Sequence, residues 1–128
     1  KTKSIKNSIY DFLKFQNLGK KLNFFKNKKI DLKHKGFDTT YIIKKNSRNF
    51  VGSLKNNNSN VQVDFFSNLP GVQLYSAQNL NYKKKLFPYQ GICLETQYFP
   101  DTPNKKNFPS TLIKANKRYT CFTKIKIY

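Results

Sequence analysis

The residue of this 128-residue chain best suited to acid–base chemistry is Glu95, its only glutamate. It lies within residues 91–99, an apolar and aromatic run that favours a β-strand. Because burying an isolated carboxylate is costly, a glutamate in this setting must be hydrogen-bonded, neutralised by a nearby charge or used in chemistry. Partly desolvated carboxylates also make effective general bases. We therefore predict that Glu95 is either a general base or a scaffold residue.

Two further polar residues stand out by their context. Asp38 follows Gly36 and Phe37 directly before a predicted strand, and Gln73 lies just after the turn signal Pro70-Gly71. An aspartate before a strand is usually a turn former, and a glutamine in a strand usually bonds the backbone or faces water. Taken alone, each therefore favours a structural role, as does Asp101 between proline and threonine.

The alternation of a strand decides where Glu95 points. Within residues 91–99, period-two counting places Glu95 on one face with Cys93, Gln97 and Phe99. The other face carries Ile92, Leu94, Thr96 and Tyr98. If this second face packs on the core, Glu95 points into a cleft or into the inside of a curved sheet.

The elements that must position these residues are mostly strands, because β-branched and aromatic residues are frequent. Residues 49–55 and 61–66 flank an asparagine-rich loop and predict a hairpin. Residues 118–128 alternate and predict a half-buried strand. Residues 4–15 fit either a helix or a strand, and residues 20–35 are expected to be irregular. The remaining predictions are strands at 39–43, 72–76 and 91–99, with an ordered proline-rich loop at 100–110.

Composition limits the class of protein. The chain is long enough for one domain, and no apolar run is long enough to span a membrane. No apolar signal segment follows the basic residues 1–6, so we expect a cytoplasmic location. Cys93 and Cys121 lack metal-site spacing and predict two buried free thiols in a reducing compartment.

The net charge of +19 suggests nucleic acid as a partner. However, 23 of the 25 basic residues are lysines, whereas reading base edges favours arginine. The lysines are spread along the chain among many asparagines. We therefore expect weak, salt-dependent attraction to polyanions and no specific nucleic-acid partner.

Three segments, taken in order, resemble the carboxy-terminal part of the aldose 1-epimerase family. They are Gly36-Phe37-Asp38, the Pro-Gly-Val-Gln-Leu-Tyr run at 70–75, and residues 91–104, which contain Leu-Glu-Thr-Gln and Pro-Asp. Tyr10-Asp11-Phe12 is similar to an aromatic-rich segment that precedes this region in the family, and residues 108–112 and 118–120 extend the resemblance over nearly the whole chain. The Leu-Glu-Thr-Gln block is its most specific part.

The resemblance implies an all-β, antiparallel β-supersandwich of the galactose mutarotase type, with sugar bound on one curved sheet. It implies interconversion of the α and β anomers of aldohexoses such as galactose and glucose, without a cofactor. In this family the residue matching Glu95 removes the proton of the C1 hydroxyl. The residues matching Asp38 and Gln73 bind the sugar, which suits groups that can each bond several hydroxyls.

The chain also departs from the family pattern. The family's general acid is a histidine from an earlier segment, whereas the only histidine here, His34, matches none of the family motifs and is expected at the surface. Family members are also more than twice as long. We therefore predict that residues 1–128 are the carboxy-terminal third of such a domain, nearly inactive without an amino-terminal portion on the same or another chain.

Two alternatives remain open at this point. The chain could be a carbohydrate-binding remnant without catalysis, with Tyr98 or Phe99 stacking on a sugar ring. It could also be a basic nucleic-acid-binding domain, although that reading leaves the placement of Glu95 unexplained.

Overall fold

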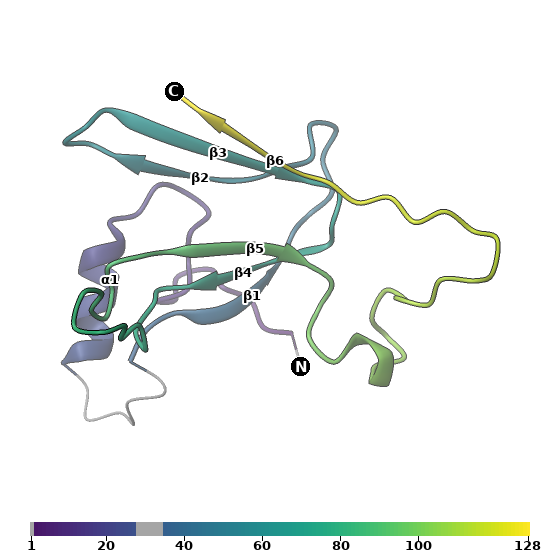
Figure 1. The fold of residues 1–128 in the computed structure, drawn as a ribbon, viewed down its shortest axis with the longest axis horizontal. Helices are drawn as coiled ribbons and strands as arrows, with labels where there is room; N and C mark the ends of the chain where they lie inside the picture. Colours follow the sequence, from purple (N-terminus) through teal and green to yellow (C-terminus); the bar gives the residue numbers. More distant parts are fainter. Residues whose placement is uncertain (1, 28–34) are drawn as a thin grey trace. The chain divides into compact units, whose positions relative to one another are not determined.

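The computed structural model describes residues 2–27 and 35–128. These ranges form two three-stranded antiparallel sheets, with strand orders β1-β4-β5 and β2-β3-β6, and one short α-helix (Figure 1). The predicted all-β, antiparallel class is confirmed. The elements are α1 (Leu18–Lys26), β1 (Asp38–Ile42), β2 (Phe50–Asn56), β3 (Val61–Ser67), β4 (Gly71–Tyr75), β5 (Cys93–Gln97), a 3-10 helix (Thr102–Asn104) and β6 (Thr123–Ile127).

Contacts between residues divide the chain into two compact units. The first unit combines Lys1–Phe37 with Ser76–Gly91, and the second combines Asp38–Tyr75 with Ile92–Tyr128. The first contains the helix, and the second contains both sheets. Each unit is therefore built from segments that are distant in sequence.

Helix α1 corrects the expectation that residues 20–35 are irregular, because residues 20–26 belong to it. The side-chain oxygen of Asn17 accepts a hydrogen bond from the Lys20 backbone nitrogen at 2.9 Å and caps the helix. Leu22 and Phe25, three positions apart, form its buried face. The stripe is only two residues long and three of the nine helix residues are lysines, so sequence analysis did not detect it.

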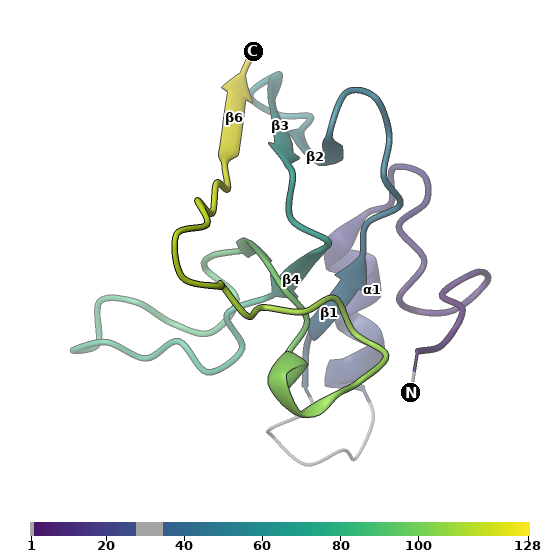
Figure 2. The ribbon, with the colours of Figure 1, turned by 90° about the vertical axis from the view of Figure 1, so that its right-hand side faces the viewer.

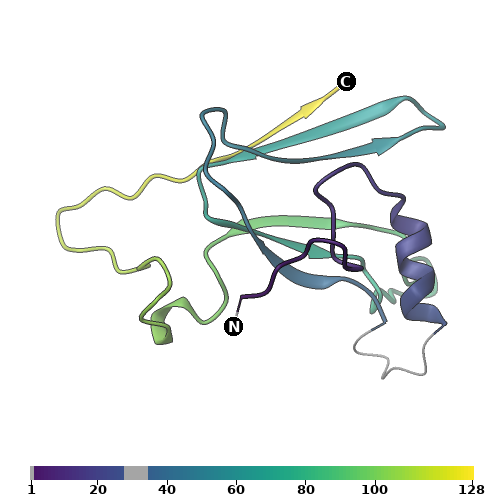
Figure 3. The ribbon, with the colours of Figure 1, turned by 180° about the vertical axis from the view of Figure 1, so that it is seen from behind.

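An aromatic cluster forms the core of the first unit. Phe37 is fully buried, and its ring packs edge to face with those of Tyr10, Phe12 and Phe25 at centroid distances of 5.9, 5.2 and 5.0 Å. Tyr10 and Phe12 come from residues 2–17, which form neither helix nor strand (Figure 3). The ambiguous pattern of residues 4–15 is thus resolved into turns that supply aromatic side chains.

In the second unit, β4 is the central strand of its sheet and has an alternating environment. Val72 and Leu74 are 6% and 7% exposed, so one face of β4 is core. Gln73 and Tyr75 lie on the other face and are half-buried. The sheet therefore has an apolar covered face and a polar open face, as expected for an antiparallel sheet.

The predicted hairpin is confirmed, since β2 and β3 pair antiparallel across residues 57–60. Strand β6 pairs with β3 at the edge of the same sheet (Figure 2). The prediction that it is half-buried is wrong, because all five of its residues are exposed, with Ile125 and Ile127 at 55% and 72%. No other part of the described chain covers its apolar side.

The two cysteines also differ from expectation. Both are free thiols, but Cys121 is exposed and Cys93 is half-buried. Cys121 precedes the exposed edge strand β6, so its apolar neighbours in sequence did not imply burial. Among the described residues, no helix is long and apolar enough to cross a membrane.

Candidate active site

The three predicted site residues lie on three neighbouring strands of one sheet. Gln73 of β4 is paired with Thr40 of β1 on one side and with Glu95 of β5 on the other. Asp38 is paired with Tyr75, one row further along the same face. The side chains of Asp38, Gln73 and Glu95 therefore emerge together on the polar face, opposite the buried apolar residues of β4.

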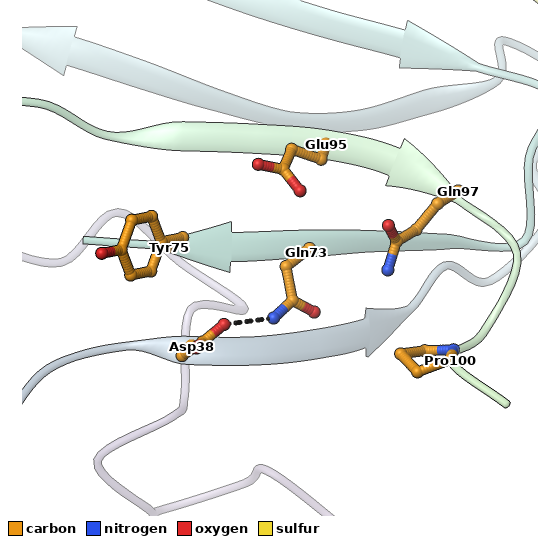
Figure 4. Close-up of a pocket in the computed structure, with 6 residues that line it drawn as sticks. All are labelled: Asp38, Gln73, Tyr75, Glu95, Gln97 and Pro100. Atoms are coloured by element: carbon orange, nitrogen blue, oxygen red, sulfur yellow. Dashed lines mark hydrogen bonds between the residues drawn. The ribbon is translucent and has the colours of Figure 1, made fainter. Parts of the chain in front are cut away.

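This face carries a hollow of about 380 Å³ (Figure 4). A volume of this order lies in the range of small-molecule pockets. It is lined by Asp38, Gln73, Tyr75, Glu95, Gln97 and Pro100. All three candidate residues thus line one hollow, and two of its other members, Tyr75 and Gln97, follow from the same alternation.

Hydrogen bonds hold the amide of Gln73 at both ends. Its Nε2 donates to Asp38 Oδ1 at 2.6 Å (Figure 4). The hydroxyl of Thr40 donates to its Oε1. A carboxylate acceptor makes the first bond charge-assisted and strong. The floor of the hollow is therefore an ordered polar network.

A model of the aldose 1-epimerase family matches residues 1–126. The chain belongs to this family. It is 30% identical over 124 residues to galactose mutarotase of Bos taurus, covering 91% of this chain and 34% of the relative. For the human and mouse proteins of that name the identities are 28% over 122 residues and 30% over 98 residues, covering 90% and 71% of this chain. The matched segments make up 34% of the human protein and 29% of the mouse protein, so the chain spans about a third of the length of these relatives.

In this member of the family, Glu95 is more open than its sequence context implied. The side chain is exposed, because β5 is an edge strand whose polar face is uncovered. Among residues 2–27 and 35–128, its carboxylate has no hydrogen-bond or ion-pair partner. The premise of partial burial is wrong, and the carboxylate is left available to a bound molecule.

The aromatic residues proposed for sugar stacking have other contacts. Phe99 packs edge to face with Phe108 at 5.1 Å, and Tyr98 lies 6.4 Å from Tyr119. A Cβ at Gly71 would be only 3.0 Å from the Phe99 ring, so glycine leaves room for this ring beside β4. Neither Tyr98 nor Phe99 lines the hollow.

Asp101 has a structural role in the loop after β5, as expected. It adopts φ 62°, a left-handed conformation that aspartate tolerates better than most residues. Its carboxylate accepts a hydrogen bond from Asn104 at 2.6 Å and pairs with Lys105 at 3.0 Å. These bonds lower the pKa of Asp101 from its ordinary value, with the Asn104 bond contributing most.

The family's histidine cannot be sought at this hollow, because the only histidine of the sequence, His34, lies outside the described residues. Nor does the described part of the chain contain a cluster of histidine, cysteine or acidic residues able to hold a metal ion. Sequence reasoning missed Thr40, although it follows Asp38 by two positions and so shares its face. Its signal was the same period-two counting that was used for residues 91–99 but not for residues 39–43.

Proposed function

We propose that the chain supplies the base and two sugar ligands of an aldose 1-epimerase, or mutarotase, site. The substrate would be an aldohexose such as galactose or glucose, converted between its α and β anomers. One observation carries this proposal: a single hollow joins Glu95 to Asp38 and Gln73. The name galactose mutarotase, borne by the relatives, supports the choice of sugar.

In the proposed reaction, Glu95 takes the proton of the C1 hydroxyl while an acid protonates the ring oxygen. The bond between C1 and the ring oxygen breaks, which gives the open-chain aldehyde. Rotation about the C1–C2 bond lets the C5 hydroxyl attack the other face of the aldehyde. The C5 hydroxyl gives its proton back to the acid, and Glu95 returns its proton to the former carbonyl oxygen, which becomes the new C1 hydroxyl. An exposed and unengaged carboxylate can reach a bound hydroxyl, as this role requires.

Asp38 and Gln73 would hold the sugar during ring opening. Asp38 Oδ1 is engaged by Gln73, so Oδ2 can accept a hydrogen bond from a sugar hydroxyl. The second N–H of Gln73 can donate to the same or a neighbouring hydroxyl. No cofactor is needed for these steps, because the sugar exchanges only protons with the protein and is neither oxidised nor reduced.

The acid must come from outside the residues that line the hollow. We propose that residues 1–128 are the carboxy-terminal part of the domain, and that an amino-terminal portion on the same or another chain brings a histidine to the sugar. The chain spans only about a third of the length of the relatives, which supports the proposed amino-terminal portion. We further propose a cytoplasmic location, which suits two free thiols.

Polarimetry of freshly dissolved α-galactose tests the proposal. The 128-residue chain should leave the rate near that of the uncatalysed reaction. The same chain joined to an aldose 1-epimerase amino-terminal portion should accelerate it. Glu95→Gln should then reduce the rate by about 10²- to 10⁴-fold, the usual contribution of a general base. Asp64→Asn, which changes a carboxylate of the other sheet, is the matched control.

A fast reaction with the 128-residue chain that Glu95→Gln leaves unchanged would refute the role of Glu95. A joined protein that binds galactose without accelerating the reaction would instead favour carbohydrate binding without catalysis. Nucleic-acid binding at this hollow has less support, because the described residues that line it include two carboxylates and no lysine or arginine.

A further inference from the structure

Thr40 lies beside the hollow without lining it. It is half-buried on β1, in the row that continues through Gln73 to Glu95. Because it is absent from the lining residues, it would affect a bound sugar only through its neighbour. The residue it contacts is one of the two proposed sugar ligands.

We propose that Thr40 is a positioning residue that holds the Gln73 amide in the orientation in which its nitrogen faces Asp38. This inference rests on the proposed function, since the amide is proposed to bind sugar. The Thr40 hydroxyl donates to Gln73 Oε1, and Gln73 Nε2 donates to Asp38 Oδ1. The carboxylate of Asp38 can only accept, so it admits only the amide nitrogen, and the Thr40 hydroxyl, which can donate or accept, secures the oxygen at the other end by donating to it.

The orientation matters for the pattern that the site offers to a ligand. With the nitrogen held toward Asp38, the hollow presents an N–H donor next to a free carboxylate oxygen. A pair of neighbouring sugar hydroxyls can match this pattern, one donating and one accepting. Without the Thr40 hydroxyl, Gln73 Oε1 loses its donor and the amide can rotate away from this arrangement.

Thr40→Val removes the hydroxyl at nearly constant volume, and Thr40→Ser keeps it. Thr39→Val is a matched control, because Thr39 pairs with Leu74 on the opposite face of the same strand. The side-chain amide resonances of Gln73 in ¹⁵N-labelled 128-residue chain report the orientation without any ligand. Galactose titration of the same samples reports its consequence for binding.

In Thr40→Val, the Gln73 amide resonances should move toward those of an exposed glutamine, and galactose affinity should fall about two- to tenfold, the usual weight of one hydrogen bond. Thr40→Ser and Thr39→Val should preserve both. If Thr40→Val does not fold, Thr40→Ala takes its place.

Unchanged amide resonances, or unchanged galactose affinity in Thr40→Val, would overturn the positioning role alone. If the wild-type chain binds no galactose, alone or joined to the amino-terminal portion, the proposed function falls and the role of Thr40 with it.

Discussion

Replacing Gly36 with alanine is expected to be the most disruptive single-methyl change in the first unit. A Cβ at this position would lie 2.5 Å from Ser76 Oγ and 2.7 Å from Gln78 Oε1. Both neighbours are buried, at 1% and 7% exposure. No described glycine has a positive φ, so Gly36 is needed for space and not for backbone conformation.

The cost can be worked out from what the methyl group displaces. Ser76 Oγ accepts a hydrogen bond from the Phe37 backbone nitrogen at 2.8 Å and donates to Gln78 Oε1 at 3.0 Å. Overpacking a dense interior costs about 1–3 kcal/mol. Leaving the buried Phe37 donor unpaired costs about 1–3 kcal/mol more. We therefore expect Gly36→Ala to lower the free energy of unfolding by about 2–6 kcal/mol.

Gly52→Ala is the matched control. Gly52 is also in the described chain, but a Cβ there would meet nothing within 4 Å. The Gly52→Ala substitution should leave the stability unchanged or raise it by about 0.4–1 kcal/mol, because alanine lowers the entropy of the unfolded chain. Urea unfolding followed by circular dichroism measures both variants. Equal stabilities of the two variants, or a Gly36→Ala variant as stable as the wild type, would refute the steric argument.

Three further predictions concern burial and charge. Phe37→Ala should lower the free energy of unfolding by about 3–5 kcal/mol in urea, because the ring is fully buried, whereas Phe24→Ala, with 43% exposure, should cost clearly less. The pKa of Asp64 is lowered chiefly by the hydrogen bond from Ser53. The carboxylate should therefore stabilise the protein above the ordinary pKa of 3.8, and this contribution should be lost as the pH falls through the lowered pKa. If the difference in free energy of unfolding between wild type and Asp64→Asn, measured in urea, stays constant from pH 6 to 2, this prediction is contradicted. The exposed Cys121 should react with a thiol reagent faster than the half-buried Cys93. Equal reaction rates of the remaining thiol in Cys93→Ser and in Cys121→Ser would be evidence against the assigned exposures.

Much of the second unit could be predicted from sequence, because its signals are local. The hairpin of β2 and β3 follows from two alternating runs around an asparagine-rich loop, and its pairing is confirmed. The alternation of residues 91–99 placed Glu95 and Gln97 on one face, and both line the same hollow. Family segments then suggested which polar residues belong together, since such motifs persist where general composition has changed.

The failures have a common physical cause. Helix α1 was missed because its buried face is only Leu22 and Phe25, a pattern too short to stand out among lysines. Strand β6 was expected to be half-buried because it alternates, but alternation does not say whether anything covers the apolar side. Burial is a property of the neighbours that a segment acquires, and these come from distant parts of the chain.

By itself, the sequence determined the strand-rich class and the family, and it suggested the residues that we propose for acid–base and sugar-binding chemistry. Only the tertiary structure decided that Gln73 stands between Thr40 and Glu95, that Asp38 bonds its amide, and that the Glu95 carboxylate is exposed. The register between strands rests on pairs of residues that are 18 to 37 positions apart in the sequence, and a shift of one residue would turn each side chain to the other face.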